Sequence, residues 1–103
     1  MTTTLFSLRD RLAACGVPDL PDHSNGAWHY QSPANAERIM VVCAIEWLMA
    51  WNPLLDLVLH QHAWGDHRAA LDDGVAWYRD GEGPTMLQAL VNLIEAVKED
   101  DDE

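Results

Sequence analysis

The chain has 103 residues and carries seventeen acidic side chains against six basic ones, a formal net charge of -11 at pH 7. This charge opposes direct binding to nucleic acid or to an anionic membrane, and it favours a basic protein surface as the partner. The length predicts a single domain with one modest core. Because apolar residues make up 49% of the composition, a disordered chain is excluded outside the acidic C-terminus.

The first predicted helix covers residues 5–15, with Thr4 as its N-cap and Gly16 as its stop. Residues 17–31 contain several Pro, Asn and Gly residues, which break helical and strand periodicity and predict a loop. We expect the end of this loop to dock on the core through Trp28, as a short extended piece.

A second helix is predicted from Ser32 and Pro33, which form an N-cap and N1 pair, to Asn52, where Pro53 stops it. Residues 39–45 in its middle are apolar around the whole circumference. Something must therefore cover a second side of this helix, and the alternatives are the first helix and a second copy of the protein.

Alternating apolar and polar residues predict a strand from residue 55 to about residue 64. Residues 67–72 are interpreted as a second strand, and Asp73-Gly74 is a hairpin signal before a third strand at residues 75–78. Because short turns join these three strands in sequence, we expect an antiparallel meander. Residues 80–83 after the third strand are interpreted as a loop.

The last predicted helix begins at Pro84 or Thr85 and has one apolar face. The fold class is α+β, in the order helix, helix, three-stranded antiparallel sheet, helix, with the helices on one sheet face or on both. We expect residues 1–98 to form one compact domain. Residues 99–103 are all acidic and oppose the dipole at the helix C-terminus, so we expect a disordered tail.

The first ten residues show no basic segment followed by a long apolar stretch, and no apolar run is long enough to span a bilayer. These features predict a cytoplasmic protein without a membrane segment. Cys15 and Cys43 lack the spacing of a metal clip, so we interpret them as reduced, small core residues.

No catalytic motif or cofactor site is evident in the sequence. Gly81-Glu82-Gly83 lacks the Lys and the Ser or Thr of a P-loop, and no Ser or Cys stands in a nucleophile motif. Asp72 and Asp73 could form a carboxylate pair for acid–base catalysis, but their place in a hairpin turn favours a backbone role. We therefore expect a protein that is not an enzyme and has no cofactor.

The carboxylates on the predicted strands and turns are the candidate partner-binding residues, and an aromatic anchor among the Trp residues would suit an interface with a basic target. The candidates are Asp56, Asp66, Asp72, Asp73, Asp80 and Glu82.

Two alternatives belong to other functional classes. His60 and His62 lie two residues apart on a predicted strand, with His67 just beyond the turn, and three imidazoles could bind zinc or nickel. The other interpretation of these residues is a solvent-facing strip without a specific role. In the second alternative, the apolar helix at residues 39–45 forms the interface of a structural homodimer.

Three pieces of the chain from Trp28 to Val97 resemble the small phage-encoded proteins of the ABA-sandwich type. They are Trp28-His29-Tyr30-Gln31-Ser32 leading into the second helix, Asp73-Gly74-Val75-Ala76-Trp77-Tyr78, and Gly83-Pro84-Thr85 opening the helix with Ala89-Leu90-Val91-Asn92-Leu93-Ile94.

This resemblance implies a phage or prophage accessory protein without an assigned active site. In size and acidity the chain is also similar to anti-CRISPR and anti-restriction inhibitors, several of which present carboxylates where DNA phosphates would lie. The function expected on this basis is an acidic inhibitor that mimics DNA. Its expected partner is a basic, nucleic-acid-handling surface of a host defence complex.

Overall fold

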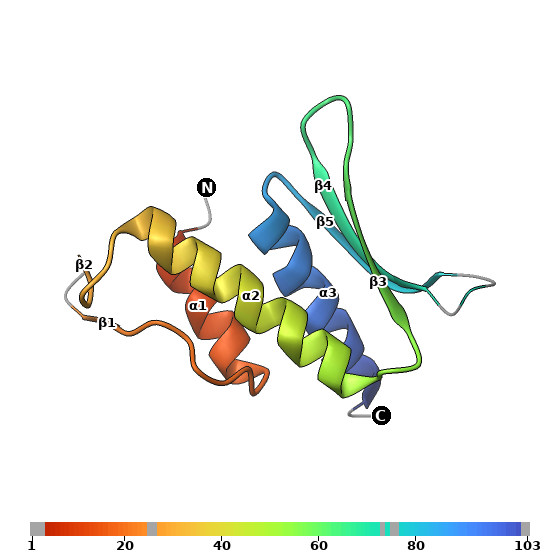
Figure 1. Ribbon diagram of the computed structural model, residues 1–103, viewed down its shortest axis with the longest axis horizontal. Coiled ribbons are helices and arrows are strands. Elements are labelled where there is room, and N and C mark those ends of the chain that lie inside the picture. Colours follow the sequence, from red (N-terminus) through yellow and green to blue (C-terminus); the bar gives the residue numbers. More distant parts are fainter. Residues whose placement is uncertain (1–3, 25–26, 73, 75–76, 102–103) are drawn as a thin grey trace.

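The computed structural model describes residues 4–24, 27–72, 74 and 77–101. Two helices, a three-stranded antiparallel sheet and a closing helix follow one another along the chain, which confirms the predicted α+β class (Figure 1). In chain order the elements are α1 (Leu5–Ala14), β1 (His23–Ser24), β2 (Ala27–Trp28), α2 (Pro33–Trp51), β3 (Asp56–Gln61), β4 (His67–Asp72), β5 (Trp77–Gly83) and α3 (Met86–Asp101).

Local capping signals determine both ends of α1. The backbone N–H of Ser7 donates to Oγ1 of Thr4 at 3.1 Å, which satisfies one of the free donors of the first turn. Gly16 has a φ of +89°, the left-handed conformation that ends a helix at low cost when the residue is glycine. The prediction for this helix is therefore confirmed.

The first turn of α2 is capped in the same way, since the N–H of Asn35 donates to Oγ of Ser32 at 3.2 Å. The buried face of α2 is a stripe of residues four apart: Ala36, Met40, Ala44 and Leu48. Helix α2 packs mainly on α3 and also contacts α1 and β3, so the first helix covers part of α2 and α3 covers more of it. Val42 and Met49 remain exposed on α2.

The strands β3, β4 and β5 form an antiparallel meander with β4 in the centre. The first strand ends at Gln61, earlier than predicted, because the chain turns back at residues 63–65, between His62 and Asp66, and Gly65 has a φ of +102°. A type I turn followed by a left-handed glycine is common in three-residue hairpin loops, and here the Gly65 N–H donates to the His62 carbonyl at 2.9 Å.

The predicted loop at residues 80–83 is wrong, because β5 continues to Gly83. Gly81 is buried in this strand, and a Cβ atom there would meet the Ala89 carbonyl oxygen of α3 at 2.5 Å. The glycine therefore lets a helix approach the strand closely, a role that the sequence pattern had attributed to a turn. Asp80 and Glu82 consequently lie on a strand.

The helix α3 begins where expected, since the N–H of Gln88 donates to Oγ1 of Thr85 at 3.2 Å. It buries a continuous apolar face that includes Leu87, Leu90, Leu93, Ile94 and Val97.

The C-terminal end of α3 differs from the prediction, because the helix continues to Asp101 and so includes residues 99–101 of the expected acidic tail. Each added residue gains a backbone hydrogen bond, and this gain outweighs the unfavourable dipole interaction there. Residues 102 and 103 lie outside the described part of the chain.

All three helices lie on one side of the sheet (Figure 1). Helix α3 packs directly on β4 and β5 and also contacts α1 and α2. Arg11 of α1 forms an ion pair with Glu95 of α3, in which Nε donates to Oε2 at 3.0 Å, and it also donates to Oδ1 of Asn92 at 3.0 Å. The hydrogen bonds with Glu95 raise the pKa of Arg11 above its ordinary value. This contact fixes α1 against α3.

The segment between α1 and α2 includes the short antiparallel pair β1 and β2. The rings of Trp28 and Phe6 lie 4.8 Å apart, and Trp28 is half-buried against the core. This arrangement confirms that the end of the segment docks on the domain as an extended piece. Among the helices of the described residues, none is long and apolar enough to cross a membrane.

Candidate functional site

The face of the sheet that points away from the helices, hereafter the open face, carries four of the six predicted carboxylates. Side chains of a strand alternate between the two faces. The helix-facing positions include Leu71, Ala69 and Gly81, which are buried. The alternate positions, matched by the strand register, form the open face and include Asp56, Asp72, Asp80 and Glu82.

Arg68 also lies on the open face and forms ion pairs with two of these carboxylates. Its Nη2 atom is 2.6 Å from Oδ2 of Asp80, and its Nε atom is 3.7 Å from Oε1 of Glu82. The side chains are 30% to 56% exposed, so water screens these contacts and each adds only a modest amount of stability. The pairs mainly hold the two carboxylates in fixed positions on β5.

Asp56 and Asp72 are direct cross-strand partners at the other end of the open face. Two like charges in this position destabilise a sheet slightly, and a cation bound between them would remove that repulsion. Asp72 also has a structural role, because its Oδ1 atom accepts the N–H of Gly74 at 2.7 Å. This contact confirms the backbone role that we assigned to Asp72. Asp73 lies outside the described residues.

Asp66 is separated from the other four carboxylates, at the tip of the β3–β4 hairpin. Its Oδ2 atom accepts the Nε1–H of Trp64 at 3.2 Å, and Trp64 stacks on His62 with 4.4 Å between the ring centroids. The indole is nevertheless 74% exposed. The hydrogen bond and the stacking hold a large aromatic side chain at the surface in one orientation, which lowers the entropy cost of using it as an anchor.

The structure brings together only two of the three histidines of the proposed metal site. The rings of His60 and His62 are 4.8 Å apart, whereas His67 belongs to the helix-facing side of β4 by strand alternation. Its Nδ1 atom is buried and has no hydrogen-bond partner in the described part of the chain. Among the described residues no group of three or more potential ligands could hold a metal ion.

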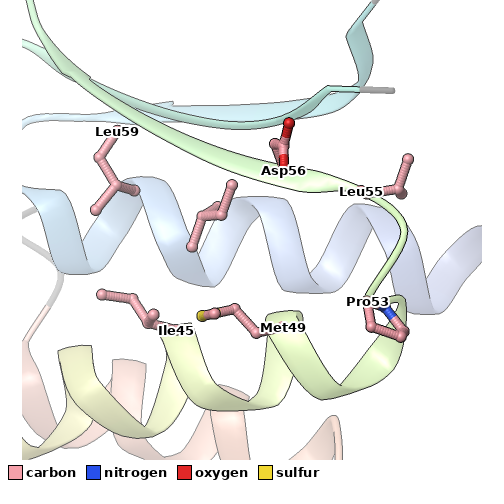
Figure 2. Close-up of a pocket in the computed structure, with 7 residues that line it drawn as sticks. Ile45, Met49, Pro53, Leu55, Asp56 and Leu59 are labelled. Carbon is pink, nitrogen blue, oxygen red and sulfur yellow. The ribbon is translucent and has the colours of Figure 1, made fainter. Parts of the chain in front are cut away.

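A groove between α2 and β3 was not predicted. It encloses about 540 Å³ and is lined by Ile45, Met49, Pro53, Leu55, Asp56, Leu57 and Leu59. Figure 2 shows Ile45 and Met49 rising from α2 towards β3, with Leu59 on the opposite wall and Asp56 pointing away from the helix. The apolar circumference of residues 39–45 was the available signal, because such a helix offers more apolar surface than one neighbour can cover.

The surface described above offers a partner two kinds of contact, charged groups and apolar side chains. The open face has four carboxylates and one guanidinium among its described positions, the hairpin tip presents Trp64, and the α2–β3 groove presents apolar side chains. Comparisons of the chain with protein-family models, with curated proteins and with solved structures gave no match.

Proposed function

We propose that this protein is a non-enzymatic inhibitor that binds a basic, nucleic-acid-handling surface of another protein through the open face of its sheet. The observation that carries the proposal is the placement of Asp56, Asp72, Asp80 and Glu82 on one face that none of the described helices covers. Adjacent strands are about 4.8 Å apart and alternate residues about 6.6 Å, so carboxylates on such a face have spacings comparable to those of backbone phosphates.

The hairpin tip supplies the second element of the proposed interface. Trp64 is exposed and held in place by Asp66, and a partner arginine could stack on the indole while it pairs with a carboxylate. In size and acidity the chain is similar to anti-CRISPR and anti-restriction inhibitors, which supports a host defence complex as the target. The identity of that complex is part of the proposal.

The test is recovery of partners from a bacterial host that carries CRISPR and restriction systems, with tagged protein and with duplex DNA as competitor. We expect a nucleic-acid-binding partner that DNA displaces, because both ligands would occupy the same basic surface. A partner that DNA does not displace would contradict the inhibition mechanism. Recovery of no partner would contradict the proposed function.

A pair of charge variants assigns the interaction to the open face. The first changes Asp56, Asp72 and Asp80 to Asn and Glu82 to Gln, which keeps hydrogen-bond acceptors for Arg68 and for the Gly74 N–H. The control variant removes four carboxylates elsewhere, through Asp19→Asn, Glu37→Gln, Glu46→Gln and Glu99→Gln. We expect the first variant to lose binding and salt dependence and the control to retain most of both. Equal losses would mean that net charge alone, without a defined surface, determines binding.

A further inference from the structure

The strand β3 is an edge of the sheet, because it pairs with β4 on one side only among the described elements. The N–H of His62 donates to the carbonyl of Asp66 across the hairpin at 2.7 Å. Because hydrogen-bonded pairs alternate along an antiparallel ladder, the even-numbered residues of β3 direct their backbone groups to β4. Leu57, Leu59 and Gln61 therefore direct their N–H and C=O groups to the free edge.

Helix α2 lies at this edge, because its main strand contact is with β3, whereas α3 packs on β4 and β5. The α2–β3 groove lies between the edge strand and this helix. Met49 is 59% exposed on its helix wall, and Leu59 is 42% exposed on its strand wall. A strand added beside β3 would lie over the groove and bury these side chains.

The charges around the edge select the kind of strand that fits. Asp56 lies on β3 at the rim of the groove with its carboxylate on the open face, and the chain carries a net charge of -11. On an added strand, side chains on the groove side would be apolar and those on the open-face side would lie beside Asp56. Lysine or arginine is the residue type that complements these positions.

A second copy of the chain fits this edge poorly. Pairing β3 with its symmetry mate would bring two α2 helices beneath two strands that are about 4.8 Å apart, whereas packed helices need about 8–10 Å. The copy would also bring another charge of -11 to the interface. A single extended segment avoids the steric conflict and the repulsion.

We propose that an extended segment of a basic partner adds to β3 as a fourth strand, with alternate apolar side chains in the α2–β3 groove and lysine or arginine side chains on the open face. This inference rests on the proposed function and specifies how its partner is recognised. The backbone groups of Leu57, Leu59 and Gln61 would supply the hydrogen bonds, and the groove would supply the side-chain pattern.

Two synthetic peptides of identical composition test the inference. In one, valine and lysine alternate, and in the other the valines and the lysines form separate blocks. Binding to the full chain is followed by fluorescence anisotropy of labelled peptide at low ionic strength. We expect the alternating peptide to bind at least about tenfold more tightly, because only it can place apolar side chains in the groove and lysines on the open face together.

Two protein variants test the role of the groove, one with a change inside it and one as a matched control outside it. Met49→Lys places a charge in the groove, whereas Ala50→Lys adds the same charge at the next exposed position of α2, which does not line the groove. We expect Met49→Lys to weaken binding of the alternating peptide about tenfold and Ala50→Lys to change it little. Circular dichroism confirms that each variant is folded.

The outcomes separate this inference from the proposed function. Equal binding of the two peptides would overturn strand addition and would leave recognition by the acidic open face intact. Failure of both peptides to bind would count against both proposals. A dimeric mass in light scattering that Met49→Lys converts to a monomeric one would overturn the inference, because a second copy would then occupy the groove.

Discussion

Gly81 of β5 lies against the backbone of Leu93 in α3, so closely that a Cβ atom at position 81 would overlap the Leu93 nitrogen. We expect Gly81→Ala to lower the free energy of unfolding by about 1–3 kcal/mol, because the helix must move away from the sheet to make room. The measurement is the urea midpoint. Gly83→Ala is the comparison, since its Cβ atom would overlap mainly the Cβ and Cγ atoms of the Gln88 side chain, whereas the Cβ atom at position 81 would overlap the helix backbone. A larger loss for Gly83→Ala would contradict this account of the packing.

The Arg11–Glu95 ion pair joins the first and last helices, and its side chains are 31% and 39% exposed. We expect Glu95→Gln to lower the free energy of unfolding by about 0.5–1 kcal/mol, because solvent screens a half-exposed pair. Glu99→Gln, one turn further along α3 and exposed, should have a smaller effect. Chemical denaturation of the two variants at the same ionic strength makes the comparison, and equal losses would show that the pair adds nothing.

Burial raises the pKa of the Cys43 thiol, and nearby Glu46 and Asp19 raise it further. A raised pKa leaves less thiolate at a given pH, so we expect Cys43 to react more slowly with iodoacetamide than an unperturbed thiol does. The Cys15→Ser variant isolates this thiol, and mass spectrometry follows the reaction. Unfolding in urea should accelerate alkylation. The same rate in the folded and unfolded states would contradict the prediction.

The histidines are expected not to form a zinc site. His60 and His62 lie together, whereas His67 is on the helix-facing side of β4. Two imidazoles without a third ligand bind zinc weakly, so zinc should leave the melting temperature unchanged. Differential scanning fluorimetry of untagged protein provides the measurement. A rise in melting temperature that His60→Ala abolishes and His29→Ala preserves would restore the metal-binding alternative.

The ends of α1 and α2 could be predicted because their signals are local. Thr4 and Ser32 accept hydrogen bonds within the first turn, and Gly16 adopts the left-handed conformation that its position suggested. The extent of β5 could not be predicted in this way. Gly81 looks like a turn residue until α3 lies against it, and that contact depends on residues eight to twelve positions away.

Only part of the candidate site could be predicted from the sequence, because the rest depends on contacts between separate segments. Composition and position identified four carboxylates: Asp56, Asp72, Asp80 and Glu82. Their placement on one face depends on the register of three strands and on β5 reaching Gly83. The pairing of Arg68 with Asp80 depends on the same register. The α2–β3 groove depends on how α2 packs beside β3, and the apolar circumference of residues 39–45 indicated spare apolar surface on α2 without indicating where it would lie.

The packing of α3 on β4 and β5 also has a consequence for the order of folding. These elements are consecutive in the chain, and they contribute ten of the seventeen buried apolar residues among those described. Contacts between neighbouring segments require little loop closure, so this C-terminal unit can form before α1 and α2 dock. Amide hydrogens in the middle of α3 should then exchange with solvent more slowly than those of α1, whose opening leaves the C-terminal unit intact.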